Sequence, residues 1–251
     1  MTATITPLIA GNWKMNGLSA SIGEVQALAN LLTAGEAPRC TVVVCPPATL
    51  LASLTQHCAA AGIVTGGQDC HTTSHGPHTG DISAAMLADA GAQFVIVGHS
   101  ERRTDHGETD SLVRRKAQAG LASGLTPIIC VGESEVERRE GRAQAVVGDQ
   151  LAESVPDEAG QQAVVVAYEP VWAIGTGHTP TADDIAEMHG MIRWLLAERF
   201  GDRGQRTPIL YGGSLKPLNA REILRIDNVD GGLVGGASLL AQDFYAIIEA
   251  V

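Results

Sequence analysis

Eight short apolar runs alternate with longer segments of helical periodicity, and this alternation constrains the fold more than any other feature of the chain. The runs that we expect to form strands cover residues 8–10, 41–45, 63–66, 94–97, 127–131, 163–168, 208–211 and 232–234. The expected helices cover residues 20–32, 49–60, 84–90, 112–122, 135–151, 182–199, 218–224 and 237–250. A helix that returns the chain between two strands makes those strands parallel, so the pattern predicts a parallel sheet.

Eight such units in 251 residues fit an α/β fold in which eight parallel strands close into a (β/α)8 barrel surrounded by helices. An open, doubly wound sheet is the structural alternative, and periodicity does not exclude it. Aromatic residues make up only 4% of the chain, so Ala, Val, Leu and Ile must fill the core. Because the composition has no break, we expect one domain over residues 1–251.

Acidic residues outnumber basic ones by 28 to 17, which gives a formal charge of −11. This excess disfavours nucleic acid and anionic membranes as partners. The odd number of cysteines and the absence of a CxxC pair predict reduced thiols in a cytoplasmic protein. The N-terminal segment does not resemble a signal peptide, and no apolar stretch is long enough to span a membrane.

Polar side chains and glycines follow five of the expected strands. They lie in the segments 11–14, 98–103, 169–170, 211–214 and 235–238. In parallel barrels the chemistry lies at the carboxyl ends of the strands. These segments would therefore bring a cation, an amide, an imidazole, a carboxylate and two glycine-rich turns to one rim.

Glu169 ends the sixth expected strand, and the segment 170–180 that follows it is rich in small residues. A carboxylate that removes a proton from carbon needs a dry site, because water weakens the electrostatics and destroys reactive intermediates. The arrangement predicts a base beneath a movable lid.

Lys14 and His99 each have an ordinary explanation beside the functional one. Most lysines are surface residues, although Lys14 lies between Trp13 and Met15, which suggests partial burial. A histidine at the end of an apolar run is more often a satisfied core residue than a catalyst. Ser100 is a good N-cap, and the N–H groups of a helix that begins after His99 would favour a neutral imidazole, which can still donate a hydrogen bond.

Two glycine-rich turns, Gly212-Gly213-Ser214 and Gly235-Gly236, each precede a helical pattern. Glycine lets the backbone approach a phosphate, and the N–H groups at a helix start can bind it. The connection over residues 69–81 is long and rich in His, Thr and Gly, so a functional or interfacial role is favoured over a plain solvated loop.

Six segments of the chain, in order, resemble the triosephosphate isomerase family: GNWKMNG (11–17), GHSERR (98–103), CVGE (130–133), AYEPVWAIGTG (167–177), YGGS (211–214) and DGGLVGGASL (230–239). The resemblance extends from near residue 8 to near residue 245. It implies a TIM barrel that interconverts dihydroxyacetone phosphate and D-glyceraldehyde 3-phosphate through an enediolate, in glycolysis and gluconeogenesis. It implies no metal and no organic cofactor.

The resemblance also implies roles for single residues. Glu169 would be the base that moves a proton between adjacent carbons, and His99, as a neutral imidazole, would polarise the carbonyl and transfer protons on the enediolate oxygens. Lys14 would supply positive charge near the substrate, and Asn12 would help to place it. Glu101 would support Lys14 and His99 from the rim.

The remaining implied residues bind phosphate or support the site. The N–H groups expected to hold the phosphate are those of Gly175, Ser214, Gly235 and Gly236. The lid, from Pro170 to about Thr179, would close over the phosphate and contact Tyr211 and Ser214. Cys130 would lie behind the base.

The segment 69–81 matches the family's dimer loop, which predicts a homodimer. Thr79 stands at the position that reaches the neighbouring subunit's site. His78 departs from the family, which usually has an aromatic residue there, and Asp81 replaces the usual Glu, so that it would reach Arg102 less easily. His106 and His178 are further departures outside the catalytic set.

Two other functions remain compatible with the sequence. An isomerase of a four-carbon ketose phosphate, such as erythrulose phosphate, would keep the same catalytic residues in a wider pocket. A catalytically idle barrel that binds phosphorylated metabolites or a protein partner predicts the loss of Lys14, His99 or Glu169, and all three are present.

Overall fold

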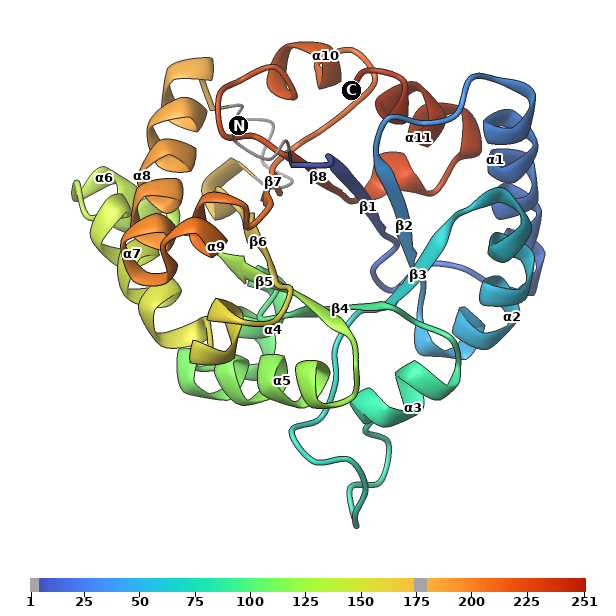
Figure 1. Cartoon of the computed structure of the whole chain (residues 1–251), viewed down its shortest axis with the longest axis horizontal. Helices are drawn as coiled ribbons and strands as arrows, with labels where there is room; N and C mark the ends of the chain where they lie inside the picture. The colour runs from blue at the N-terminus through green and yellow to red at the C-terminus, as the bar shows by residue number, and fades with distance from the viewer. Residues whose placement is uncertain (1–4, 174–179) are drawn as a thin grey trace.

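The computed structural model describes residues 5–173 and 180–251, and within them eight parallel strands form a closed barrel (Figure 1). Each strand pairs with the next, and β1 pairs with β8, so the alternative of an open sheet is excluded. The strands are β1 (Leu8–Asn12), β2 (Thr41–Cys45), β3 (Val64–Gly67), β4 (Phe94–Val97), β5 (Thr126–Val131), β6 (Val165–Tyr168), β7 (Ile209–Tyr211) and β8 (Gly231–Val234). The predicted closed barrel of eight parallel strands is confirmed.

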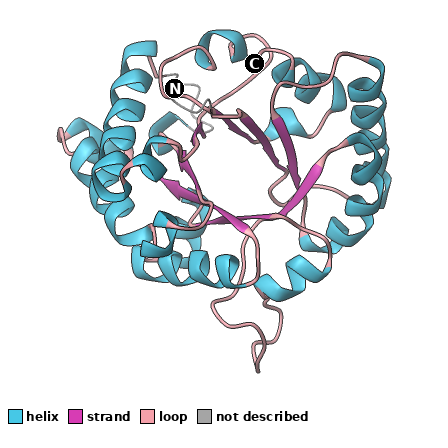
Figure 2. Cartoon of the chain, viewed as in Figure 1, coloured by secondary structure: helices cyan, strands magenta, loops and turns pink. Residues whose placement is uncertain are grey.

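The helices surround the ring of strands (Figure 2). They are α1 (Ile22–Ala34), α2 (Ala48–Cys58), α3 (Ala84–Asp89), α4 (Ser100–His106), α5 (Asp110–Ala122), α6 (Glu135–Arg139), α7 (Ala143–Ser154), α8 (Ala182–Phe200), α9 (Asp202–Gln205), α10 (Ala220–Ile223) and α11 (Ala241–Ile248). Short 3-10 helices add η1 (Ser19–Ser21), η2 (Ala59–Ala61), η3 (Asp157–Gly160), η4 (Val171–Ala173) and η5 (Gly236–Ser238). Among the described residues, no helix has both the length and the apolar character that crossing a bilayer would require.

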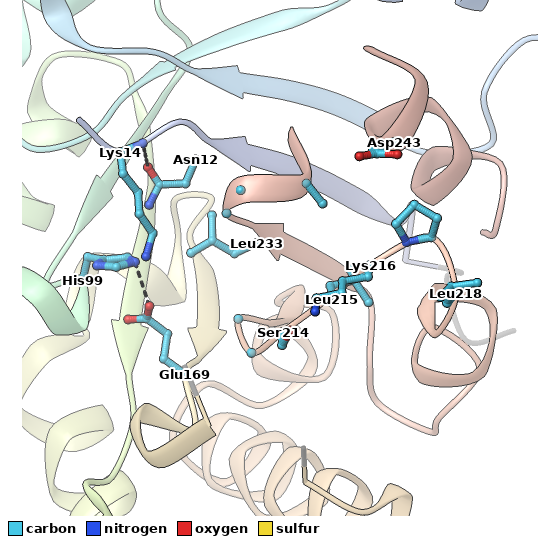
Figure 3. A pocket seen from close by; sticks show the side chains of 16 residues that line it. Asn12, Lys14, His99, Glu169, Ser214, Leu215, Lys216, Leu218, Leu233 and Asp243 are labelled. Carbon is cyan, nitrogen blue, oxygen red and sulfur yellow. Dashed lines mark hydrogen bonds and ion pairs between the residues drawn. The ribbon is translucent and has the colours of Figure 1, made fainter. Parts of the chain in front are cut away.

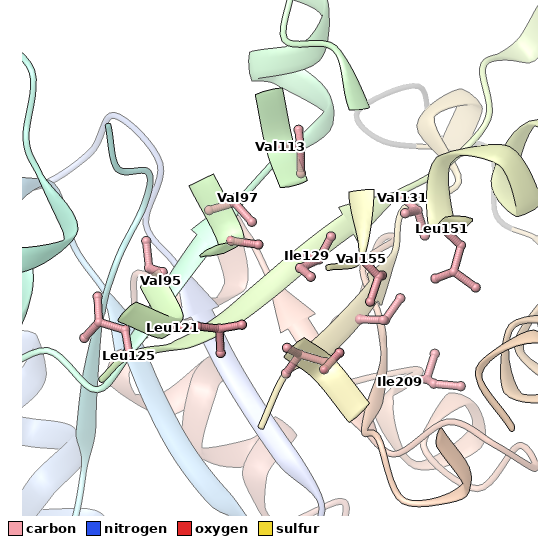
Figure 4. Packing of buried hydrophobic residues seen from close by; sticks show 14 of the residues in the cluster. Val95, Val97, Val113, Leu121, Leu125, Ile129, Val131, Leu151, Val155 and Ile209 are labelled. Carbon is pink, nitrogen blue, oxygen red and sulfur yellow. The ribbon is translucent and has the colours of Figure 1, made fainter. Parts of the chain in front are cut away.

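Alternate strand residues fill the inside of the barrel and the layer between strands and helices. In β2, Val43 and Cys45 belong to the inner cluster, whereas Val42 and Val44 pack outward. The buried inner cluster is Leu8, Ala10, Val43, Cys45, Ile96, Ile128, Cys130, Val165, Ala167, Leu210 and Leu233. Figure 4 shows part of the outer layer, where β-branched strand residues meet leucines and valines of α5 and α7. Aliphatic side chains therefore fill the core, as the low aromatic content predicts.

Several helix predictions were wrong at their ends or in their continuity. The predicted helix over 135–151 is two helices, α6 and α7, because Gly141 between them has φ +70°, outside the helical region. Within the predicted helix 218–224, only α10 is helical. The predicted helix 237–250 is two elements, η5 and α11. The N-cap of α4 is His99 rather than Ser100, and α9 was not predicted.

The segment 69–81 projects from the barrel between β3 and α3 (Figure 1). It contains no helix or extended strand, and an isolated bridge joins its His71 to Ser83, which follows the segment. Ser83 caps α3 by accepting the backbone N–H of Met86. The predicted long connection is therefore present.

Candidate functional site

A cavity of about 720 Å³ opens at the carboxyl ends of the barrel strands. Its walls carry the polar groups and glycine-rich turns that the sequence places on one rim. They include Asn12, Lys14, His99, Glu169, Gly212, Gly213, Ser214, Gly235 and Gly236. Figure 3 shows Asn12, Lys14, His99 and Glu169 grouped at one side of it.

Glu169 is 1% exposed, and its carboxylate is held by the start of α4. One oxygen, Oε2, accepts the backbone N–H of Ser100 at 2.9 Å, and Oε1 lies 2.9 Å from His99 Nε2. Burial raises the pKa of Glu169, but His99 and the Ser100 N–H outweigh this, so the pKa lies below its usual value. The lowered pKa favours the ionised carboxylate in this arrangement.

His99 is the N-cap of α4, and its ring contacts two acidic side chains. Its Nδ1 accepts the backbone N–H of Glu101 at 3.3 Å, so the ring proton belongs on Nε2, which faces Glu169. Burial lowers the pKa of His99, but the Glu169 carboxylate outweighs this and leaves the pKa above its usual value. From the sequence, we expected only that the helix start would lower the pKa of His99. The structure shows that the Glu169 carboxylate acts in the opposite direction and raises it.

Lys14 has a left-handed backbone, with φ +54°, which is uncommon for a residue with a side chain. Three contacts hold it. Its N–H donates to Asn12 Oδ1 at 3.0 Å, its carbonyl accepts from Gln68 Nε2 at 2.8 Å, and its Nζ lies 2.5 Å from Glu101 Oε1. The ammonium group is thereby positioned at the wall of the cavity.

Glu101 contacts both residues that it was predicted to support. Besides its ion pair with Lys14, its Oε2 lies 3.6 Å from His99 Nδ1. Cys130 lies beside Glu169 inside the barrel, and burial, reinforced by that carboxylate, raises the pKa of its thiol. Glu101 and Cys130 therefore adjoin the residues that were predicted to be catalytic.

The two glycine-rich turns face the same cavity. A Cβ on Gly212 would lie 2.8 Å from Glu169 Cγ, so only glycine fits there without displacing the carboxylate. The helix η5 begins at Gly236, whereas α10 begins only at Ala220, so the turn at Ser214 is held by Asn219 instead, whose Nδ2 donates to the Ser214 carbonyl at 2.9 Å. A helix therefore begins directly at Gly235-Gly236, as predicted, but not directly after Gly212-Gly213-Ser214.

Other predicted residues lie apart from this cluster or outside the described residues. Gly175 and His178 belong to residues 174–179, which are outside the described part of the chain. Tyr211 is fully buried, and its hydroxyl has no hydrogen-bond partner among the described residues. Thr79 is exposed on the projecting segment and does not line the cavity of its own chain.

Arg102 has carboxylate partners other than Asp81. It pairs with Asp69 at 2.9 Å and with Glu108 at 2.6 Å, whereas Asp81 faces His71. Lys116, which is only 6% exposed, joins Asp69 and Glu108 in the same network. The replacement of Glu by Asp at position 81 therefore leaves Arg102 fully paired within the chain.

Three residues of the site were missed in the sequence. Ser100 binds the Glu169 carboxylate, Gln68 binds the Lys14 carbonyl, and Glu133 anchors the near end of the predicted lid. Glu133 is fully buried and accepts hydrogen bonds from Tyr168 Oη at 3.1 Å and Trp172 Nε1 at 2.8 Å. All three follow expected strands closely, so the rule that located His99 could have found them.

Comparisons with known proteins agree with this geometry. The family model described as "Triosephosphate isomerase" matches residues 7–251. The triosephosphate isomerase of Afipia carboxidovorans is 59% identical over 251 residues, covering 100% of this chain and 99% of that protein. That of Xanthobacter flavus is 55% identical, covering 100% of both chains. The crystal structure of triosephosphate isomerase from Bartonella henselae has a TM-score of 0.90 and 46% identity, covering 98% of this chain and 99% of that one.

Proposed function

The chain belongs to the triosephosphate isomerase family, and on that premise we propose that Glu169 is its catalytic base and His99 its electrophile. The protein is an isomerase that interconverts dihydroxyacetone phosphate and D-glyceraldehyde 3-phosphate, a reaction of glycolysis and gluconeogenesis. The observation that carries the residue assignment is the contact of a buried carboxylate with an imidazole on the wall of a cavity that also holds Lys14.

Substrate binding must first separate Glu169 from His99, since a gap of 2.9 Å between their polar atoms admits no substrate. The carboxylate then takes a proton from the carbon next to the carbonyl, and the released electron pair forms the carbon–carbon double bond of the enediolate. The carbonyl oxygen becomes the oxyanion. Return of the proton to the neighbouring carbon completes the isomerisation.

His99 Nε2–H, Lys14 and Asn12 stabilise the oxygen on which charge develops. A preorganised donor of this kind contributes about 3–4 kcal/mol. Separation from Glu169 also removes the larger of the two negative charges that raise the pKa of His99, while burial, Lys14 and the helix start still oppose the charge of Glu101. The imidazole is then neutral when it donates to the substrate and moves protons between the enediolate oxygens.

The N–H groups at Ser214, Gly235 and Gly236 bind the phosphate, together with Gly175 of the lid, which lies outside the described residues. The lid closes over the substrate and excludes water from the intermediate. A local positive site is needed because the chain carries a formal charge of −11 and the substrate is itself an anion. Lys14 and the N–H groups at the start of η5 supply it.

The working enzyme is a homodimer that forms through the segment 69–81, with Thr79 reaching the partner's site. Large apolar side chains are exposed beside this segment: Met15 is 97% exposed, Met86 58% and Ile82 36%. Met15 and Ile82 also line a second cavity of about 330 Å³ that can receive a loop. The five unpaired, buried thiols support a cytoplasmic location.

A coupled isomerase assay on Glu169→Gln tests the catalytic assignment. Loss of the base lowers kcat by about 10²–10⁴-fold, because proton transfer is the step that it performs. Glu153→Gln, which neutralises an exposed acid on α7, serves as the matched control and retains the wild-type rate. Retention of most activity by Glu169→Gln contradicts the assignment. If kcat/KM is higher for the four-carbon ketose phosphate than for dihydroxyacetone phosphate, the assignment of the three-carbon substrate is wrong.

A further inference from the structure

Gln150, on α7, binds both backbone polar groups of Gly132 with one side-chain amide. Its Oε1 accepts the Gly132 N–H at 2.7 Å, and its Nε2 donates to the Gly132 carbonyl at 3.0 Å. Gly132 directly follows β5, whose pairing with β6 ends at Val131 and Tyr168. The amide therefore supplies two hydrogen bonds to a residue that lies beyond the end of the sheet pairing. Because an amide is planar, the two bonds fix the orientation of this backbone as well as its position.

The backbone of Gly132 lies against that of Glu169. A Cβ on Gly132 would overlap the Glu169 carbonyl oxygen and lie 2.7 Å from its carbonyl carbon, so no side chain fits there. The neighbouring Val131 carbonyl accepts the Glu169 N–H at 2.8 Å. Since close-packed groups transmit small shifts, a displacement of Gly132 also displaces the backbone that carries the Glu169 carboxylate.

Glu133, the next residue, extends this contact to the chain that follows Glu169. Its carbonyl accepts the Val171 N–H at 3.2 Å, and its buried carboxylate accepts the Trp172 Nε1–H at 2.8 Å. Residues 131–133 thus bind the chain at Glu169 and just after it. The amide on α7 holds the middle of this segment.

The carboxylate end of Glu169 is held by α4, through the Ser100 N–H. Arg103 connects α4 to α7, because its Nη2 donates to Ser154 Oγ at 3.0 Å. Ser154 lies one turn after Gln150 on α7. The backbone and the carboxylate of Glu169 are therefore both held by one connected pair of helices.

Gln150 does not reach the substrate cavity. It lines a separate cavity of about 190 Å³ behind Glu169, together with Ser100, and is not among the residues that line the larger cavity with His99. Any effect of its amide on the reaction must therefore pass through other residues. We propose that Gln150 is a positioning residue of the isomerase reaction, which holds Gly132 and thereby fixes the Glu169 carboxylate relative to the substrate. This role rests on the proposed function of Glu169 as the base.

Steady-state kinetics of Gln150→Met test this role. Methionine is similar in length but has no amide, so Gly132 loses both hydrogen bonds. A shift well below 1 Å should lower kcat about 10-fold, because a misplacement of 1 Å costs about 10²-fold. KM changes little, since the phosphate contacts remain. Gln144→Met removes an exposed amide of the same helix, which donates to Glu187 at 2.6 Å, and it retains the wild-type kcat.

A double-mutant cycle with Glu169→Asp distinguishes positioning from a general effect on the fold. Glu169→Asp already withdraws the carboxylate, so Gln150→Met should lower kcat only about 2-fold or less in that background. An equal loss in both backgrounds contradicts the proposal. If Glu169→Gln is inactive while Gln150→Met retains the wild-type kcat, the positioning role is wrong and the assignment of the base stands. If Glu169→Gln remains active, the assignment of the base is wrong, and the positioning role falls with it.

Gln150→Glu provides a second measurement that does not depend on how the methionine variant folds. The ionised carboxylate accepts the Gly132 N–H but has no proton for the Gly132 carbonyl, whereas the protonated carboxyl can satisfy both groups. The ratio of its kcat to that of wild type at the same pH should therefore rise as the pH falls from about 8 to about 5. A constant ratio contradicts the proposal, and circular dichroism at each pH verifies the fold.

Discussion

Glu169 and His99 are in direct contact, and both are held by the start of α4. The same helix start that binds the carboxylate through the Ser100 N–H also orients the His99 ring through the Glu101 N–H. Glu169 and the His99 ring are therefore positioned by one short element, α4, although they follow different strands, β6 and β4. A small displacement of either group should change the rate strongly.

Glu169→Asp tests this sensitivity to position. Removal of one methylene keeps the charge but withdraws the carboxylate by about 1 Å, and a misplacement of this size costs about 10²-fold in kcat. KM changes little, because the phosphate contacts remain. Steady-state kinetics in both reaction directions measure the effect, and a rate within a few-fold of wild type would show that placement of the carboxylate is not critical.

His189 provides a pH-dependent term in stability. It is fully buried, its Nδ1 lies 3.0 Å from the Asn228 carbonyl, and burial lowers the pKa of the ring from 6.5 to about 4. Below pH 6.5 the imidazole of His189 is protonated in the unfolded chain, but in the folded protein it stays neutral until about pH 4. Because the unfolded state then binds more protons, the free energy of unfolding falls as the pH falls from 6.5 to about 4. Between pH 7 and pH 5 the loss amounts to about 2 kcal/mol.

His189→Gln removes this dependence while keeping a donor for the Asn228 carbonyl. Urea denaturation at pH 7 and pH 5, at one protein concentration, should show that the variant loses about 2 kcal/mol less than wild type over this interval. His106→Gln, at an exposed position on α4, should behave as wild type. An unchanged pH dependence in His189→Gln would mean that other groups carry the acid sensitivity.

At the scale of elements, the break between α6 and α7 depends on one backbone conformation. Apolar periodicity continues through residues 135–151, but Gly141 adopts φ +70° and Ala143 starts a new helix. Periodicity records which residues are apolar and says little about where the chain turns, which explains why this break was not predicted.

Two glycine-to-alanine substitutions test how backbone conformation alone affects stability, because neither added methyl group changes the packing. A Cβ at Gly141 or at Gly190, within α8, meets no atom within 4 Å. Gly141→Ala should lower the free energy of unfolding by about 1 kcal/mol, because alanine disfavours the left-handed region. Gly190→Ala should raise it by about 0.5–1 kcal/mol, because alanine favours the helix. Denaturant titration measures both, and equal effects of one sign would contradict this interpretation.

For the whole molecule, the proposed homodimer places the projecting segment and its apolar surroundings in an interface. Met86→Asp puts a charge on a side chain that is 58% exposed on α3, and it should convert the dimer to monomers at micromolar concentration. Trp194→Asp alters a side chain of similar exposure, 60%, on α8, and should leave the dimer intact. Sedimentation equilibrium distinguishes the two, and a monomeric wild type would contradict the proposal.

The amino-acid sequence predicts the order of the eight strands, their parallel pairing and the rim on which Lys14, His99 and Glu169 lie, whereas closure into a barrel rather than an open sheet was settled by the pairing of β1 with β8. The strand order, the pairing and the rim follow from local periodicity and from the rule that barrel chemistry occurs at strand ends. The tertiary structure alone shows that Ser100 binds the Glu169 carboxylate, that Gln68 binds the Lys14 carbonyl, and that His71, His78 and Asp81 lie together. Such contacts depend on barrel closure and on left-handed turns at single residues, and neither leaves a periodic trace in the sequence.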